Sequence, residues 1–145
     1  PYFNQAIEEL LIKTQCRFEH RTPTHIVGIE SRGFVLGSIL AHAMNLPFVM
    51  VRKKGAKYPG ELLEQSYALE YGSATLTLQT GLLGHTDRCI IADDLVATGG
   101  SVLATKNLIE QTGASVLGIS TVIDLTYLRP ESLHLDMAYL ERVTT

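Results

Sequence analysis

The sequence predicts a single α/β domain, with a doubly wound, mostly parallel sheet flanked by helices. Two observations favour this fold class. Short apolar runs, such as residues 24–29 and 89–92, have the length and composition of strands that are buried on both faces. These runs alternate along the chain with helical patterns, and this alternation is typical of parallel strands joined by right-handed crossovers.

The first predicted element is an amphipathic helix over residues 3–14, where apolar side chains recur at helical spacing and charged ones lie opposite. The buried strand over residues 24–29 comes next, followed by a nearly all-apolar helix that ends near Asn45, a plausible cap. Residues 47–51 predict a second short buried strand. The alternation of Leu and Thr over residues 74–78 predicts another strand.

The second half of the chain repeats the order of strand and helix. The strand over residues 89–92 precedes a helix over residues 102–112. Residues 115–125 are rich in β-branched and apolar side chains and predict another central strand, in which Asp124 is interpreted as a polar end. One more strand is expected near residues 137–140.

The composition of the chain restricts the kinds of partner that the protein can bind. A chain of 145 residues, 46% hydrophobic and 19% charged, is long enough and apolar enough for one folded domain with its own core. A net charge of -3 argues against a general nucleic-acid binder, and no apolar run reaches the roughly 18 residues that a spanning helix needs. We therefore expect neither nucleic acid nor a membrane as a partner. Cys16 and Cys89 are interpreted as reduced, small hydrophobic side chains, which favours a cytoplasmic location.

Two acids and a glycine-rich segment follow the strand over residues 89–92. Asp93 and Asp94 place two carboxylates at its carboxyl end, the edge at which open α/β sheets bind ligands. Adjacent carboxylates repel each other unless a cation or sugar hydroxyls engage them. The segment after them offers backbone N–H groups and a helix N-terminus to a phosphate. Its candidate binding residues are Ala97, Thr98, Gly99, Gly100 and Ser101. Together these features predict a site for a phosphorylated sugar.

Two other strand ends carry residues suited to an anion. The first, Glu30-Ser31-Arg32-Gly33, includes an Arg, whose planar fork suits phosphate oxygens. The second is a cationic stretch over residues 52–60 in a chain that is acidic overall, and positive charge there would attract a diphosphate. The candidate pyrophosphate-binding residues are Glu30, Ser31, Arg32, Lys53 and Lys57.

Residues 93–101 resemble the phosphoribosyl-pyrophosphate motif of type I phosphoribosyltransferases, and the Ala-Thr-Gly-Gly-Ser version is most similar to that of the adenine phosphoribosyltransferase family. Two further motifs carry the resemblance, Glu-Ser-Arg-Gly-Phe at residues 30–34 and Ser-Tyr-Ala-Leu-Glu-Tyr-Gly at residues 66–72. The resemblance implies a type I phosphoribosyltransferase fold and an enzyme of purine salvage. That enzyme would transfer the 5-phosphoribosyl group of phosphoribosyl pyrophosphate to adenine, giving AMP and pyrophosphate. It also implies Mg²⁺, held through substrate oxygens, and a homodimer.

The resemblance also implies roles for single residues. Residues 61–73 would form a mobile loop that closes over the reacting centre, although their pattern alone favours a β-hairpin. Glu70 would manage a proton on the purine, Tyr71 would pack near the leaving group, and Arg52 would stabilise the departing diphosphate. A cis peptide before a residue other than proline is common in the family's pyrophosphate loop. The family's base-recognition segment precedes the position of Pro1, and we expect that this segment is missing from a chain that does not begin with methionine.

Two alternatives remain open from the sequence. One is a related transferase for another base, such as hypoxanthine, guanine, xanthine or orotate. The other is a non-catalytic regulator that binds phosphoribosyl pyrophosphate on the same scaffold. A regulator would need no closing acid, so Glu70 is the residue that separates an enzyme from a regulator.

Overall fold

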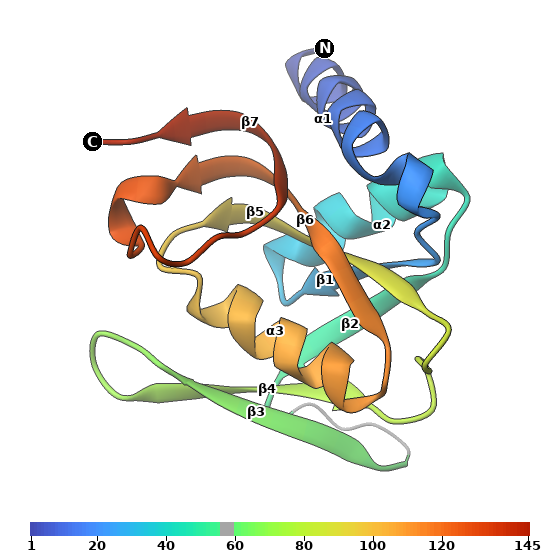
Figure 1. The fold of residues 1–145 in the computed structure, drawn as a ribbon, viewed down its shortest axis with the longest axis vertical. Helices are drawn as coiled ribbons and strands as arrows, with labels where there is room; N and C mark the ends of the chain where they lie inside the picture. The colour runs from blue at the N-terminus through green and yellow to red at the C-terminus, as the bar shows by residue number, and fades with distance from the viewer. Residues whose placement is uncertain (56–59) are drawn as a thin grey trace.

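The computed structural model describes residues 1–55 and 60–145, and these form a seven-stranded sheet with helices on both faces (Figure 1). The strands are β1 (His25–Ile29), β2 (Phe48–Lys53), β3 (Leu62–Ala68), β4 (Ser73–Gln79), β5 (Arg88–Val96), β6 (Ser115–Leu125) and β7 (Met137–Val143). The helices are α1 (Tyr2–Phe18), α2 (Arg32–Met44) and α3 (Gly100–Gln111), with short 3-10 helices η1 (Glu19–Arg21) and η2 (Thr126–Leu128).

The sheet is mostly parallel, which confirms the predicted fold class. Its strand order is β3-β4-β2-β1-β5-β6-β7. The pairs from β2 to β7 in this order are parallel, whereas β4 is antiparallel to both of its neighbours, β2 and β3. β1 and β5 are neighbours at the centre although they are far apart in the chain. Because the carboxyl ends of parallel strands meet at one edge, the segments that follow β1, β2 and β5 begin at the same edge.

The central strands are covered on each face by different helices. Ile26 of β1 packs in a core cluster with side chains of α1 and α2. The next residue, Val27, packs in a second cluster with side chains of α3. This division follows from the two-residue period of a strand. In Figure 1, α1 and α2 lie on one side of the sheet, and α3 lies on the other beside the β3–β4 hairpin, which it contacts. None of the helices in the described part of the chain is both long and apolar enough to cross a membrane.

The two acids lie inside a strand and not beyond its end, which corrects the expectation from the sequence. β5 does not stop at Ala92 but continues to Val96. The reason is that β6 stays paired with β5 along this whole stretch, with Asp93 opposite Thr121. Similarly, α3 already begins at Gly100, earlier than the apolar pattern indicates.

Three further observations bear on the expectations. Arg52 and Lys53 belong to β2 and not to the segment after it. Both cysteines are free, as expected; Cys89 is buried in β5, and Cys16 is exposed on α1. Residues 61–73 contain β3, a turn and the start of β4, so the hairpin interpretation of this segment is confirmed.

Candidate functional site

A cavity of about 640 Å³ lies at the carboxyl end of β5. It is lined by residues 97–101, by Asp93 and Leu95 of β5, by Arg32 of α2 and by residues 67–70 at the tip of the hairpin. The structure therefore brings the glycine-rich segment, one of the two acids and the predicted closing segment to one place. With Arg32 included, the lining residues come from three separate parts of the chain.

The glycine-rich segment turns at Gly99, where the backbone has φ +90°, a conformation that favours glycine. Gly99 is also the N-cap of α3, and its carbonyl accepts a hydrogen bond from the N–H of Leu103 at 2.9 Å. A methyl group added at Gly99 would lie 3.4 Å from the side chains of Arg129 and Leu133, so the segment rests directly on residues that follow β6. The helix N-terminus and its N–H groups make this turn suited to an anion.

The carboxyl groups of Asp93 and Asp94 are held by different partners. One oxygen of Asp93 accepts the backbone N–H of Asp94 at 2.9 Å, and the Nε of Arg32 lies 3.1 Å from Oδ2 of Asp94. The pKa of Asp93 is raised to about 7, mainly by burial and also by the charge of Asp94, although the N–H of Asp94 and the charge of Arg32 act in the opposite direction. The buried Oδ1 of Asp94 has no hydrogen-bond partner among the described residues. This pair of acids is thus suited to a ligand that supplies hydroxyl groups or a cation.

The segment after β1 is tied to the end of β2. Its Glu30–Ser31 peptide bond is cis, as the family resemblance implies. Oε1 of Glu30 accepts the backbone N–H of Lys53 at 3.1 Å and lies 3.5 Å from Nε of Arg52. The Glu30 carboxylate therefore faces β2, and it holds two of the candidate pyrophosphate-binding segments together.

Gly33 allows this segment to approach β5 closely. A methyl group at Gly33 would lie 2.7 Å from the carbonyl oxygen of Ala92 and 3.4 Å from Oδ1 of Asp93. Real side chains essentially never come as close to a backbone oxygen as the first of these distances. The start of α2 can therefore lie against the acids only because this position has no side chain.

The tip of the hairpin reaches the same cavity. Glu70 lines it, and the ring of Tyr67 lies so near Gly100 that a methyl group there would be 3.1 Å from Cδ2 of the ring. Partial burial raises the pKa of Tyr67, and the charge of Asp93 adds to this effect. Tyr71 is 87% exposed and is not part of the cavity lining.

The remaining predicted site residues do not line the cavity. Those in the described part of the chain are Glu30, Ser31, Arg52, Lys53, Tyr71 and Asp94. Asp94 lines a neighbouring, mostly apolar cavity of about 370 Å³ together with Arg32, so Arg32 borders both spaces. Lys57 lies outside the described residues.

Sequence reasoning missed Tyr67 and the buried ion pairs of Asp124. Tyr67 belongs to a strand with an exposed and a covered face, and the alternation along residues 63–67 could have placed it toward α3. Asp124 is not a polar strand end, because it is fully buried and paired with Arg129 and Arg142. No local pattern signals these pairs, since a buried acid in β6 looks like a polar end until the chain folds back on it.

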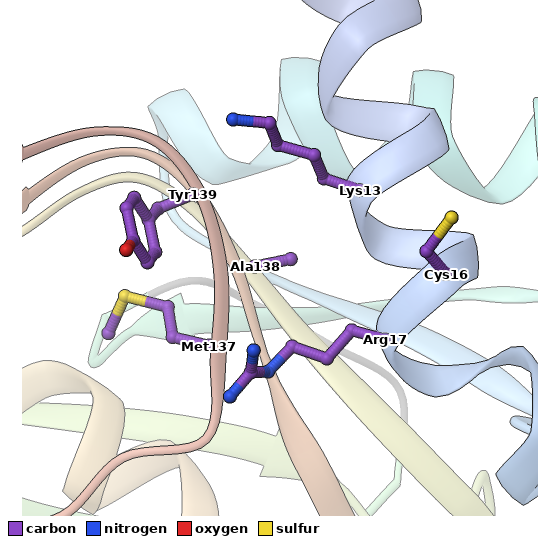
Figure 2. Close-up of a pocket in the computed structure, with 6 residues that line it drawn as sticks. All are labelled: Lys13, Cys16, Arg17, Met137, Ala138 and Tyr139. Atoms are coloured by element: carbon purple, nitrogen blue, oxygen red, sulfur yellow. The ribbon is translucent and has the colours of Figure 1, made fainter.

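A further hollow, of about 400 Å³, lies away from these residues between α1 and the start of β7 (Figure 2). Lys13, Cys16 and Arg17 line it from α1. Nε of Arg17 lies 2.5 Å from Oδ1 of Asp136, and Nη1 of Arg21 lies 3.3 Å from Oδ2 of the same carboxylate. These ion pairs fasten α1 and η1 to the segment before β7, so we interpret this groove as structural.

Comparison with known proteins defines the class of the chain. Residues 1–144 match the family described as the phosphoribosyl transferase domain, and the chain therefore belongs to the phosphoribosyltransferase family. Within that family it is similar to proteins named adenine phosphoribosyltransferase. One of them, from Methylibium petroleiphilum, is 44% identical over 116 residues. The aligned part is 77% of this chain and 59% of that relative, so the chain spans about three fifths of its length.

Solved structures lead to the same family. The crystal structure of adenine phosphoribosyltransferase from Rhodothermus marinus superposes with a TM-score of 0.83 at 40% identity, covering 97% of this chain and 79% of that one. The enzyme from Saccharomyces cerevisiae, in complex with an imino-altritol bisphosphate and adenine, gives a TM-score of 0.81 at 39% identity, covering 87% of this chain and 71% of that one. The resemblance seen in the three sequence motifs is thus confirmed.

Proposed function

We propose that this protein is an adenine phosphoribosyltransferase of purine salvage, which converts adenine and phosphoribosyl pyrophosphate to AMP and pyrophosphate. The observation that carries the proposal is the composition of the 640 Å³ cavity, which combines residues 97–101, Asp93 and Glu70. An anion cradle, an acid for ribose hydroxyls and a second acid across the cavity are the groups that this transfer needs. The S. cerevisiae relative, with a bisphosphate analogue and adenine bound, supports the choice of substrates.

In this proposal the glycine-rich segment anchors the 5′-phosphate. Ala97, Thr98, Gly99, Gly100 and Ser101 supply N–H groups, hydroxyls and the N-terminus of α3. Asp93 and Asp94 accept hydrogen bonds from the ribose hydroxyls and favour positive charge on the sugar as the bond at C1′ breaks. The sugar is then held at both ends while C1′ moves.

Glu70 is the proposed proton acceptor. A ring nitrogen of adenine forms a bond to C1′ as the bond between C1′ and the pyrophosphate oxygen breaks. The electron pair of the broken bond leaves with pyrophosphate, and the nitrogen's proton passes to the Glu70 carboxylate. Tyr71 packs against the leaving group in this proposal, which requires the hairpin tip to move from its exposed position.

The segment after β1 and the last residues of β2 form the proposed pyrophosphate site. Ser31 and Arg32 offer a hydroxyl and a guanidinium, and Arg52 and Lys53 add positive charge at the end of β2. Glu30 acts here by positioning the end of β2, because its carboxylate contacts Arg52 and the backbone of Lys53. Lys57 is proposed for the same site from the sequence alone.

Mg²⁺ is the proposed cofactor, held mainly by oxygens of the diphosphate and the sugar. The residues present fit a hard cation, because the buried Oδ1 of Asp94 has no protein hydrogen-bond partner among the described residues. When bound, Mg²⁺ would offset the charge that develops on the leaving diphosphate. We also propose a homodimer and a cytoplasmic location. The free cysteines support the location, and sedimentation of the purified protein tests the dimer.

The decisive experiment measures pyrophosphate release from phosphoribosyl pyrophosphate by the full-length protein with Mg²⁺. Adenine, hypoxanthine, guanine, xanthine and orotate are supplied in turn. We expect release with adenine and much slower release with the other bases. If another base gives faster pyrophosphate release, that base and not adenine is the substrate. Binding of phosphoribosyl pyrophosphate without release for any base would favour the regulator.

A further inference from the structure

We propose that Arg129 is a positioning residue for the phosphate-binding segment 97–101, and that the buried carboxylate of Asp124 holds it in place. The inference rests on the proposed function, because it explains how the segment is kept ready for the phosphate. Arg129 follows η2 and lies outside every motif that the sequence analysis singled out.

Arg129 contacts the segment at its beginning and at its turn. Its Nη1 donates hydrogen bonds to the carbonyl oxygens of Ala97 at 3.0 Å and Val96 at 3.4 Å. Its Cδ lies 3.4 Å from the place that a side chain on Gly99 would occupy. One side chain therefore supports the last residue of β5, the first residue of the segment and its sharp turn.

These contacts have a consequence for the N–H groups on the other side. In a trans peptide the carbonyl and the following N–H point in opposite directions. When the carbonyls of Val96 and Ala97 face Arg129, the N–H groups of Ala97 and Thr98 are turned away from it. Ala97 and Thr98 line the cavity. Arg129 thus fixes the orientation of peptide groups that the proposal assigns to the phosphate.

Arg129 is itself held by a buried ion-pair cluster. Asp124 is fully buried, and the Arg129 side chain is only 6% exposed. Nη2 of Arg129 donates to one oxygen of Asp124, and Nε of Arg142 donates to the other at 2.8 Å. The guanidinium of Arg142 also lies 4.0 Å from the centre of the Tyr139 ring. Because two cations surround one anion, the cluster keeps a positive charge beneath the phosphate-binding segment.

The test compares Arg129→Met with Arg142→Met in the full-length protein. Both variants remove one arginine from Asp124, but only Arg129 contacts the segment. Affinities for ribose-5-phosphate and for pyrophosphate are measured by calorimetry, because the two ligands report on different parts of the proposed site. For Arg129→Met we expect the dissociation constant of ribose-5-phosphate to rise roughly 10- to 100-fold, as loss of hydrogen bonds from a charged donor predicts. Pyrophosphate should bind as in the wild type, and Arg142→Met should bind both ligands within a factor of about two.

Two results would overturn the inference. One is an unchanged affinity of Arg129→Met for ribose-5-phosphate. The other is an equal loss for both ligands in both variants, which would indicate general destabilisation. If Arg129→Met does not fold, Arg129→Lys serves instead, since it keeps a charge beside Asp124 but cannot reproduce the planar fork, and the same selective loss is expected.

A further variant separates this inference from the proposed function. Thr98→Val removes a hydroxyl from the phosphate-binding segment without touching Arg129. If the wild type fails to bind ribose-5-phosphate, or if Thr98→Val binds it equally well, the proposed phosphate site is wrong. If Thr98→Val weakens binding and Arg129→Met does not, the phosphate site stands and the positioning role is wrong.

Discussion

The pKa of the Asp93 carboxyl group is set by opposing effects of its surroundings. Burial and the neighbouring charge of Asp94 favour its neutral form, and the charge of Arg32 favours the ionised form. With a pKa of about 7, the group is close to half ionised at neutral pH without a ligand. A ribose whose hydroxyls donate hydrogen bonds would bind the ionised form better.

The affinity for ribose-5-phosphate should therefore rise with pH and level off above about 7. Below that pH each unit should weaken binding up to about tenfold, because a growing fraction of Asp93 carries a proton. Calorimetric titrations at a series of pH values between roughly 5 and 8 would measure this dependence. Asp93→Asn is the control, since it cannot ionise while the ligand's own phosphate still titrates. If the affinities of the two proteins for ribose-5-phosphate change in parallel with pH, the ionisation of Asp93 has no role in binding this ligand.

Gly33 provides a second test at the scale of one residue. In Gly33→Ala the new methyl group would meet the carbonyl of Ala92 at 2.7 Å, so the start of α2 must move away from β5. We expect a loss of roughly 1–3 kcal/mol in the free energy of unfolding and weaker ligand binding. Gly84→Ala is the matched control, because a methyl group there meets nothing within 4 Å. Urea denaturation of both variants measures the difference, and equal stabilities would contradict the close approach.

At the scale of secondary-structure elements, the β3–β4 hairpin connects the sheet to the cavity. It extends the sheet beyond β2, it packs against α3, and its tip carries Glu70 into the cavity lining. The side-chain oxygen of Gln65 in β3 accepts a hydrogen bond from Gln111 of α3 at 3.3 Å. Movement of the hairpin tip would therefore change the lining of the cavity.

Glu70→Gln should lower kcat for pyrophosphate release by roughly 10²- to 10⁴-fold, the range for loss of a general acid or base. The KM for phosphoribosyl pyrophosphate should change little, because the amide fills the same space. Glu61→Gln, an exposed acid just before β3, is the control and should keep the wild-type rate. If Glu70→Gln turns over normally, Glu70 has no part in the proton transfer.

The sequence predicted most helices and strands correctly, but not all of the residues at which they begin and end. The parallel strands followed from short apolar runs between helical patterns, because burial on both faces leaves that signature. The end of β5 did not follow from it, since Asp93 and Asp94 are polar and their strand conformation depends on pairing with β6. Arg129 was missed for a similar reason, because its contacts exist only after η2 has brought it beneath the phosphate-binding segment.

At the scale of the whole molecule, the ionisation of Asp93 links the site to stability. Its pKa is raised from 3.8 to about 7 on folding, so between these values the folded protein holds a proton that the unfolded chain has lost. The contribution of Asp93 to the free energy of unfolding must therefore fall as pH rises from about 4 to 7.

Denaturation of the ligand-free protein across this pH range tests the linkage. The difference in unfolding free energy between the wild type and Asp93→Asn should shift against the wild type as pH rises and become constant above about 7. Comparing the two proteins removes the contributions of other titrating groups. A difference that stays constant across the range would contradict a raised pKa for Asp93.

The central position of β1 and β5 has a consequence for local motion. These strands are hydrogen-bonded neighbours, yet β2, β3 and β4 lie between them in the chain. A ligand held both by the segment after β1 and by the segment after β5 would act as a removable cross-link between two distant stretches of polypeptide. Amide hydrogen exchange in both strands should then slow together when the ligand is present, while exchange in β7 at the sheet's edge stays nearly as fast as before.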